Sequence, residues 1–286
     1  MAAIYFVGPY RPVLCGIADY TEFVARELPH GRWGVISFDP QRYGSPIAPG
    51  SDRLPDGRIW YGLPERERVE AEHIMEGLRR LNGGTDGAVL WFQHEWGIWP
   101  DVEHFTSLMR ELPVPKLVTF HTLHFQSAET PEGLDRREYL LLDRILPHVD
   151  AITVFTQGVH GAVTSAFPEH SSKIHLIEHG VHAHQVARRL SRKEARQKLE
   201  DFLLYEADLP RRTRERLFSA RVFRDMPVFI VGQTGFLCPY KQSELLYQLR
   251  DDLQKAIPHR RIVAVRIGVL RDKAQAAYAR LLQREQ

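Results

Sequence analysis

Three short apolar segments of this sequence, residues 89–92, 116–120 and 174–177, are each followed by polar residues that can do chemistry. An uninterrupted apolar run is typical of a strand buried in a parallel sheet, and open α/β sheets bind ligands just beyond the carboxyl ends of such strands. We therefore expect one polar ligand site at one edge of a sheet. The residues expected there are Gln93, His94 and Glu95 after the first segment, His121 and His124 after the second, and His179 after the third.

The same histidines could instead bind a metal ion. Two pairs have the spacing H-x-x-H, namely His121 with His124 and His179 with His182, and His184 follows. Both pairs lie at predicted strand ends or in loops, whereas the zinc-binding pair of an H-E-x-x-H motif shares one face of a helix. We therefore predict no metal site and interpret these histidines as hydrogen-bonding residues.

Two turns that contain glycine could bind an anion. The loop of residues 9–16 ends at Gly16 and Ile17, where a helix is predicted to start, and residues 235–241 join a strand to a helix in the same way. The N–H groups at a helix amino terminus attract phosphate or carboxylate, and Lys241 could reach a diphosphate bound there. Neither turn has a dinucleotide-binding or P-loop pattern. The first could therefore be a plain turn, and Lys241 could be a solvated lysine.

The composition is typical of a soluble globular protein, because 43% of the 286 residues are hydrophobic and 26% are charged. The 38 basic and 36 acidic residues give a net charge of +2, so no nucleic-acid partner is indicated. Cys15 and Cys238 are far apart in the sequence, which favours a reducing compartment over a disulfide framework. No apolar run approaches the roughly 20 residues of a membrane span, and residues 4–8 are too few for a secretion signal. We predict a cytoplasmic protein.

Basic residues cluster in two stretches, residues 188–198 and 211–216. One interpretation is a solvated helical face. The other is a surface for an anionic lipid, a phosphate or a partner protein, since clustered basic residues attract all three. The second interpretation leaves open a peripheral position at the inner face of the membrane.

The alternation of strands and helices predicts an α/β protein with a mostly parallel, doubly wound sheet. The first series has strands at 4–8, 33–38, 59–62, 89–92, 117–120, 151–155 and 174–177, and helices at 17–28, 67–81, 101–112, 131–146 and 159–167. The second series has strands at 228–231 and 262–267 and helices at 243–256 and 273–282. Between them, Ser191 and Glu194 form a capping-box pattern at the start of a helix. We predict a Rossmann-like domain at 1–181, a helical connector at 182–226 and an incomplete Rossmann-like domain at 227–286.

Six segments occur in the order seen in family 4 glycosyltransferases, which the chain resembles over residues 1–270. The segments are Gly16-Ile17-Ala18-Asp19-Tyr20, Gln93 to Ile98, Thr119 to Leu123, Phe155-Thr156, Ile177 to Val181, and Gly235 to Lys241. The resemblance implies the GT-B fold, in which two Rossmann-like domains face each other over a cleft. It also implies retaining transfer of a hexosyl group, such as mannosyl or glucosyl, in polysaccharide or cell-envelope glycan synthesis.

The resemblance also assigns roles to single residues. It implies donor binding by Gly16, Ile17, Gly235 and Lys241, catalysis by His121 and Lys241, and acceptor binding by Gln93, His94, Glu95 and His124. Lys241 would neutralise the departing nucleoside diphosphate, which is electrostatic stabilisation of a leaving group. No cofactor is implied, since a nucleotide sugar, such as a GDP- or UDP-hexose, and a glycan acceptor are substrates.

The second part of the chain departs from the family pattern. Phe236 stands where the family often has Arg, Gln242 stands where it has Gly, and no E-x7-E motif follows Val228. Fewer residues follow Gly235 than the roughly 100 that a domain usually needs. We therefore expect a truncated donor domain, completed by self-association or by a companion chain, and weak transfer by this chain alone.

Two other functions fit part of the sequence. A catalytically weak or inactive relative would bind a sugar or a partner glycosyltransferase without transferring anything. An NAD-dependent or metal-dependent enzyme fits less well, because the motifs that such enzymes need are absent. The sequence also has no G-x-S-x-G elbow, and neither cysteine lies beside a histidine, so it indicates no protein nucleophile.

Overall fold

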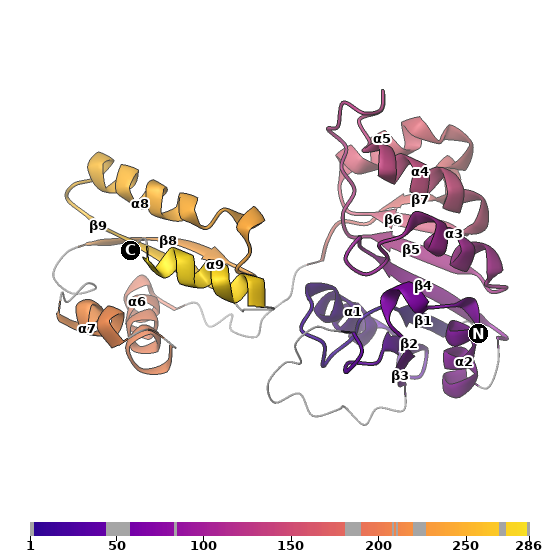
Figure 1. The fold of residues 1–286 in the computed structure, drawn as a ribbon, viewed down its shortest axis with the longest axis horizontal. Coiled ribbons are helices and arrows are strands. Elements are labelled where there is room, and N and C mark those ends of the chain that lie inside the picture. The colour runs from indigo at the N-terminus through magenta and orange to yellow at the C-terminus, as the bar shows by residue number, and fades with distance from the viewer. Residues whose placement is uncertain are drawn as a thin grey trace. The chain divides into compact units, whose positions relative to one another are not determined.

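The structure is a computed structural model that describes residues 3–43, 58–82, 85–180, 190–207, 209, 211–219, 227–268 and 273–284. It divides into two compact units, Met1–His182 and Ala183–Gln286. Figure 1 shows the first unit in indigo to pink and the second in orange to yellow. Each unit has its own sheet and its own helices, so each is described by itself.

Within its described residues the first unit contains a seven-stranded sheet in which neighbouring strands are parallel. The strands are β1 (Ala3–Val7), β2 (Trp33–Phe38), β3 (Ile59–Leu63), β4 (Ala88–His94), β5 (Lys116–Phe120), β6 (Ala151–Val154) and β7 (Ile174–Leu176). Their order in the sheet is β3-β2-β1-β4-β5-β6-β7. This confirms the predicted Rossmann-like α/β fold. The pairing of β1 with β4 marks the switch point at which such sheets bind ligands.

Helices cover both faces of this sheet. They are α1 (Gly16–Glu27), α2 (Ala71–Asn82), α3 (Val102–Glu111), α4 (Arg136–Ile145) and α5 (Gln157–Ala166). A small apolar cluster that includes Phe6 and Ala25 packs α1 against one face. A larger cluster that includes Val7, Phe92 and Leu141 lies against the other, because successive strand residues point to opposite faces. Burial on both faces explains why the strands read as unbroken apolar runs.

Two helices of the first unit begin later than the sequence predicts. The helix predicted at 67–81 is α2, which starts at Ala71 after a 3-10 turn. The helix predicted at 131–146 is α4, which is capped by Asp135, because this side chain accepts a hydrogen bond from a backbone N–H of the first turn at 2.9 Å. The prediction rested on periodicity alone and therefore included, at the start of both helices, residues that form turns in the structure. Residues 121–135 therefore form a long loop between β5 and α4.

The second unit is built, within its described residues, on the parallel pair β8 (Val228–Thr234) and β9 (Arg261–Ile267). β8 thus extends beyond the strand predicted at 228–231. The helices are α6 (Arg192–Asp201), α7 (Arg211–Ser219), α8 (Glu244–Ala256) and α9 (Lys273–Arg284). The predicted capping box of Ser191 and Glu194 is present at α6. α6 lies in the predicted connector and belongs to this unit, where Arg196 donates a hydrogen bond to the carbonyl oxygen of Val228 at 2.7 Å.

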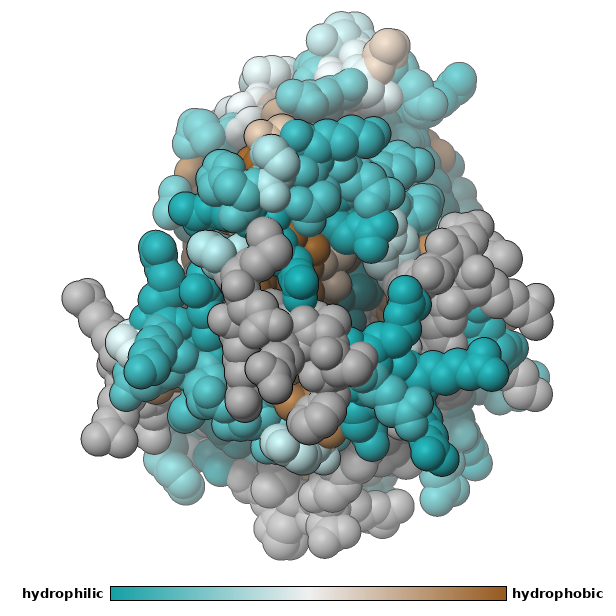
Figure 2. Space-filling view, turned by 90° about the vertical axis from the view of Figure 1, so that its left-hand side faces the viewer, coloured by the Kyte–Doolittle hydropathy of each residue, from teal (hydrophilic) through white to brown (hydrophobic). Residues whose placement is uncertain are grey.

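The described residues that face the viewer in Figure 2 are mainly hydrophilic. Arg211, in one of the two basic stretches, has a side chain that is 91% exposed. The basic residues of α7 are exposed, as both interpretations of that stretch require. None of the helices in the described ranges is both long and apolar enough to span a bilayer.

Trp99 joins the core of the first unit to the end of β4. Its fully buried ring packs against Phe92 and Phe105, with ring centroids 5.9 and 5.5 Å apart. Its Nε1–H donates a hydrogen bond to the carbonyl oxygen of Gln93 at 3.0 Å. We predict that Trp99→Ala lowers the free energy of unfolding by about 3–5 kcal/mol, because it leaves a large cavity in the core.

Urea titration followed by tryptophan fluorescence measures this loss, since all five tryptophans lie in the first unit. Leu140→Ala is the control, because the Leu140 side chain is 40% exposed and its removal opens no cavity. A loss as small for Trp99→Ala as for the control would contradict the packing described here.

Candidate functional site

The carboxyl ends of β4 and β5 lie side by side and bring three of the predicted site residues together. The backbone N–H of His121 donates to the carbonyl oxygen of His94 at 3.0 Å. The Nε2 of His121 lies 2.9 Å from Oε1 of Gln93. Because an amide oxygen only accepts, Nε2 carries the hydrogen, and Nδ1 of His121 is left as an acceptor.

An aromatic cluster surrounds His121. Tyr20 of α1 lies edge-on to His121 with ring centroids 4.9 Å apart, and Phe155, which follows β6, lies 5.3 Å from it. His179, which follows β7, packs against Phe155 at 4.9 Å and against Tyr20 at 5.2 Å. The cluster therefore joins the ends of β5, β6 and β7 to α1. Gly16 lies at the same edge, since it begins α1 just beyond the carboxyl end of β1.

Burial keeps two histidines of this edge uncharged. Desolvation and, to a smaller extent, the nearby His179 together lower the pKa of His121 to about 4. Desolvation likewise lowers the pKa of His94 to about 3, with smaller contributions from His121 and Arg137. Both imidazoles are therefore neutral at pH 7. The edge offers hydrogen-bonding groups and ring faces at these positions, and no positive charge.

His94 lies inside the core beneath this edge. Its side chain is 1% exposed, and its ring packs against Trp96, Phe105 and Phe120 with centroids 5.2, 4.9 and 4.9 Å away. Neither ring nitrogen has a hydrogen-bond partner among the described residues. Gln93 is fully buried as well. Direct contact of either side chain with an acceptor thus stays a prediction.

The two other predicted acceptor-side residues lie in loops that follow the strands. Oε2 of Glu95 accepts a hydrogen bond from the hydroxyl of Thr122 at 2.6 Å, which ties the loop after β4 to the loop after β5. Nδ1 of His124 lies 2.8 Å from Oε1 of Glu138 on α4. The hydrogen bond to Glu138 raises the pKa of His124. His124 is therefore held by a buried carboxylate that was not among the predicted site residues.

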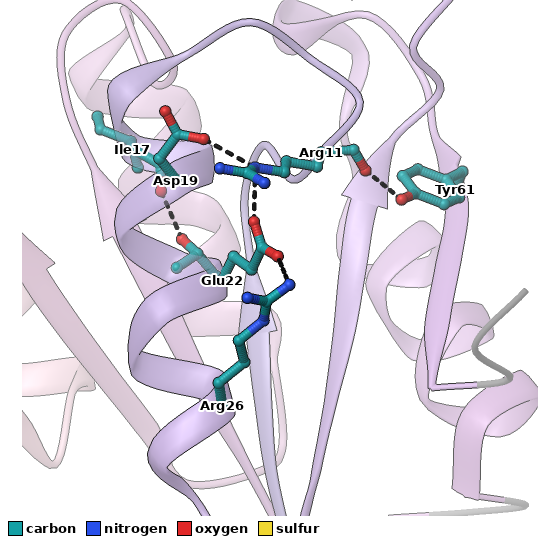
Figure 3. A network of polar contacts seen from close by, with 7 residues as sticks. Arg11, Ile17, Asp19, Glu22, Arg26 and Tyr61 are labelled. Carbon is teal, nitrogen blue, oxygen red and sulfur yellow. Dashed lines mark hydrogen bonds and ion pairs between the residues drawn. The ribbon is translucent and has the colours of Figure 1, made fainter. Parts of the chain in front are cut away.

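Ion pairs fix the loop that precedes Gly16 to α1 (Figure 3). In this loop, Nε of Arg11 lies 2.9 Å from Asp19 and 2.5 Å from Glu22. Glu22 also pairs with Arg26. The Glu22 side chain is 1% exposed, and a buried carboxylate is stable only when it is paired. The network thus determines the course of the backbone that leads to Gly16 and Ile17.

In the second unit the turn of residues 235–241 is built on Arg266, at the end of β9. Nη2 of Arg266 donates to the carbonyl oxygen of Phe236 at 2.8 Å, and Nη1 donates to that of Gln233 at 3.1 Å. Its Nε donates to Oγ of Ser243 at 3.0 Å. Arg266 therefore binds both ends of the turn and places a positive charge against its backbone.

Two residues at the ends of this turn have positive φ angles, which are typical of the left-handed region. Gly235 has φ +119°, and Gln242 has φ +49°. Glycine adopts such angles at the lowest energetic cost. The glycine that follows the lysine in the family pattern would therefore suit the backbone that Gln242 has here. Lys241 ends a short 3-10 turn and is exposed.

Across the described ranges, no group of three or more His, Cys, Asp or Glu residues is placed to hold a metal ion. His124 pairs with Glu138, and His179 belongs to the aromatic cluster, so these two serve other contacts. His182 and His184 lie outside the described residues.

Four residues that shape these sites were missed by the sequence reasoning: Tyr20, Glu22, Glu138 and Arg266. Patterns were available for two of them. Glu22 occupies a helix position whose neighbours on the same face, Ala18 and Ala25, are buried. Arg266 interrupts the apolar run that begins at Ile262 in β9. A charged residue in a buried pattern must have a partner, and that partner marks a constrained place in the fold.

Comparison with solved structures found similar folds. One is an α,α-trehalose-phosphate synthase (UDP-forming) from Burkholderia vietnamiensis. The alignment covers 99% of this chain and 68% of the synthase chain, with a TM-score of 0.55 and 13% identity. Another is an E. coli protein named for trehalose-6-phosphate and bound with UDP-2-fluoro glucose. The alignment covers 99% of this chain and 69% of the E. coli chain, with a TM-score of 0.53 and 13% identity. A third is the N-terminal domain of trehalose-6-phosphate phosphatase from Candida albicans. The alignment covers 99% of this chain and 68% of that domain's chain, with a TM-score of 0.52 and 11% identity.

At these identities the likeness concerns the fold, which the chain shares with all three proteins. No protein-family model and no curated protein matches the sequence.

The environment of His94 predicts how the first unit responds to acid. Its pKa is about 3 in the folded protein and 6.5 in a model peptide, so the unfolded state binds a proton below about pH 6.5 that the folded state does not bind. Stability is therefore full above that pH and falls as the pH drops. Between pH 7 and pH 5 the loss is roughly 2 kcal/mol for each such histidine.

We predict that His94→Phe is as stable as the parent at pH 7, since the ring nitrogens make no hydrogen bond and the neighbours are aromatic. The variant loses less stability than the parent between pH 7 and pH 5, as measured by urea titration with tryptophan fluorescence. His30→Phe, at an exposed position, keeps the acid sensitivity of the parent. Equal sensitivity of all three proteins would show that His94 is not buried in its neutral form.

Proposed function

We propose that this chain is a retaining glycosyltransferase. It transfers a hexosyl group from a nucleotide sugar, such as a GDP- or UDP-hexose, to a saccharide or lipid-linked acceptor in polysaccharide or cell-envelope glycan synthesis. It acts in the cytoplasm or at the inner face of the membrane. The observation that carries the proposal is the cluster of Tyr20, His121, Phe155 and His179 at the carboxyl edge of the first sheet.

The chemistry of this cluster suits a sugar. Aromatic rings present apolar faces to the C–H groups of a pyranose, and the neutral His121 can exchange hydrogen bonds with hydroxyl groups. The cluster lies next to the switch point between β1 and β4, where sheets of this kind bind ligands. His121 is therefore the residue proposed to lie by the transferred sugar, with Glu95 and His124 toward the acceptor.

The turn of residues 235–241 is proposed to bind the donor diphosphate. Lys241 is exposed on it, and Arg266 supports its backbone with a second positive charge. Arg266 thus provides a positive charge of the kind that the family often has at the position of Phe236. Two cations near a departing diphosphate stabilise the charge that develops on it, which is the largest catalytic contribution in many enzymes.

The proposed transfer needs no protein nucleophile. The bond between the anomeric carbon and the diphosphate oxygen breaks, and a bond from the anomeric carbon to the acceptor oxygen forms on the same face. The hydrogen of the acceptor hydroxyl passes to the departing phosphate oxygen. The E. coli protein with a similar fold, which is bound with UDP-2-fluoro glucose, supports a nucleotide sugar as the donor.

We predict that the parent chain binds UDP or GDP, and that Lys241→Ala weakens the binding by about 1.5–3 kcal/mol, the contribution of a charge-assisted hydrogen bond. Isothermal titration calorimetry measures both affinities. Lys255→Ala is the matched control, since Lys255 lies in the same unit and pairs with Asp252 across 3.7 Å on an exposed face. The control binds like the parent.

The same preparations, incubated with UDP-glucose or GDP-mannose and with methyl α-D-glucopyranoside or methyl α-D-mannopyranoside as the acceptor, test the chemistry. The parent releases the nucleoside diphosphate slowly, in line with the weak transfer expected of this chain alone, and proton NMR of the glycoside product shows the anomeric configuration of the donor. Binding without any release would support a sugar-binding relative that does not transfer. No binding of either nucleotide would refute the proposed donor site.

A further inference from the structure

The long loop between β5 and α4 forms a pocket within the first unit that the proposed donor chemistry does not use. Its volume is about 380 Å³, within the range of roughly 300–1,000 Å³ that is usual for small-ligand sites. The lining residues are Leu123, His124, Phe125, Gln126, Ser127 and Asp135. The loop starts at His121 of the aromatic cluster, so the first residues that line the pocket follow that cluster directly in the chain.

Close backbone contacts hold the pocket in shape. The N–H of Ser127 donates to the carbonyl oxygen of Gly133 at 2.8 Å. Gly133 has φ +89°, and a Cβ there would lie 2.4 Å from the carbonyl oxygen of Phe125, so only glycine fits. The ring of Phe125 lies so close to Gly158 of α5 that a Cβ at Gly158 would be 2.3 Å from it. Phe125 is thus seated against α5 and still 37% exposed.

A buried carboxylate orients His124 at the wall of the pocket. Both oxygens of Glu138 are used, because Oε2 accepts the backbone N–H of His124 at 2.7 Å and Oε1 lies 2.8 Å from its Nδ1. Glu138 is 1% exposed, whereas the His124 side chain is 63% exposed. Since a carboxylate accepts, Nδ1 carries the hydrogen. Nε2 accepts a hydrogen bond while the ring is neutral and donates one when the ring is protonated, a form that Glu138 favours because it raises the pKa of His124. This arrangement fixes the tautomer and the direction of the ring.

The charges around the pocket select against an anion. The carboxylates of Glu138, Asp135 and Glu95 all act on His124, and the residues that line the pocket include no Lys or Arg. A phosphate would be repelled here. An exposed aromatic face, an amide, a hydroxyl and an oriented imidazole instead match a neutral pyranose, which has C–H groups on one face and hydroxyl groups around its rim.

We propose that this pocket binds one neutral hexopyranose ring, with Phe125 against a face of the ring and Nε2 of His124 in a hydrogen bond with one of its hydroxyl groups. The identification of this ring as part of the acceptor rests on the proposed function. The oriented imidazole makes the site specific, because a bound sugar must place a hydroxyl group within hydrogen-bond distance of Nε2.

Saturation-transfer NMR with the full chain tests the site, with methyl α-D-glucopyranoside and methyl α-D-mannopyranoside as probes. We expect the parent to bind at least one of them in the millimolar range. Phe125→Ala weakens that binding at least tenfold and His124→Ala about fivefold or more. Leu140→Ala is the matched control, because this side chain on α4 is also apolar and 40% exposed, and the variant binds like the parent.

Calorimetry with UDP and GDP on the same variants separates this inference from the proposed function. Nucleotide binding is the same in Phe125→Ala, His124→Ala and the parent, since the proposed diphosphate turn lies in the other unit. If the parent binds a nucleotide and neither glycoside, the saccharide pocket is refuted and the proposed function stands. If Phe125→Ala and Leu140→Ala bind a glycoside equally well, the sugar lies elsewhere and the pocket is refuted. If the parent binds a glycoside that Phe125→Ala does not, but neither nucleotide, the pocket stands and the proposed donor is wrong.

Discussion

The site depends on the parallel pairing of β4 with β1 on one side and with β5 on the other. Parallel strands end at the same edge, so three stretches of sequence deliver their polar residues to one place. The backbone bond from His121 to His94 continues this ladder beyond β5 and fixes the position of the His121 ring. At this edge the ring is buried beside Tyr20 and Phe155, and desolvation keeps it neutral. The position of the His121 ring at the sheet edge thus determines its lack of charge.

The two units differ in the charge they offer a ligand. At the edge of the first sheet the functional groups are uncharged imidazoles and aromatic rings, and its loop pocket is bordered by carboxylates. In the second unit Lys241 is exposed on the turn, and Arg266 donates hydrogen bonds to the backbone at the turn. A nucleotide sugar has the same division, since its hexose is neutral and its diphosphate is anionic. Each unit thus matches the part of the substrate that the proposal assigns to it.

The sequence was most informative where periodicity determines structure. Apolar runs located the strands, and the strand ends located Gln93 and His121, because a parallel sheet leaves few alternatives for where an end can lie. Partners brought together by loops were not predictable. Glu138 reaches His124 only because α4 starts at Arg136, and helix boundaries are decided by caps and tertiary contacts rather than by periodicity. Arg266 and the turn it supports come from separate strands of the second unit, and no local pattern joins them.

Hydrogen–deuterium exchange of the chain, with and without saturating UDP-glucose or GDP-mannose, tests the central claim most directly, namely that ligands bind at the carboxyl ends of the strands. The account predicts slower exchange in peptides that cover residues 14–20, 120–124 and 235–243. Peptides at the opposite edge of the first sheet, residues 111–116 and 147–151, are expected to be unchanged. Protection confined to that opposite edge, or no protection at any of these segments while either nucleotide sugar is bound, would contradict it.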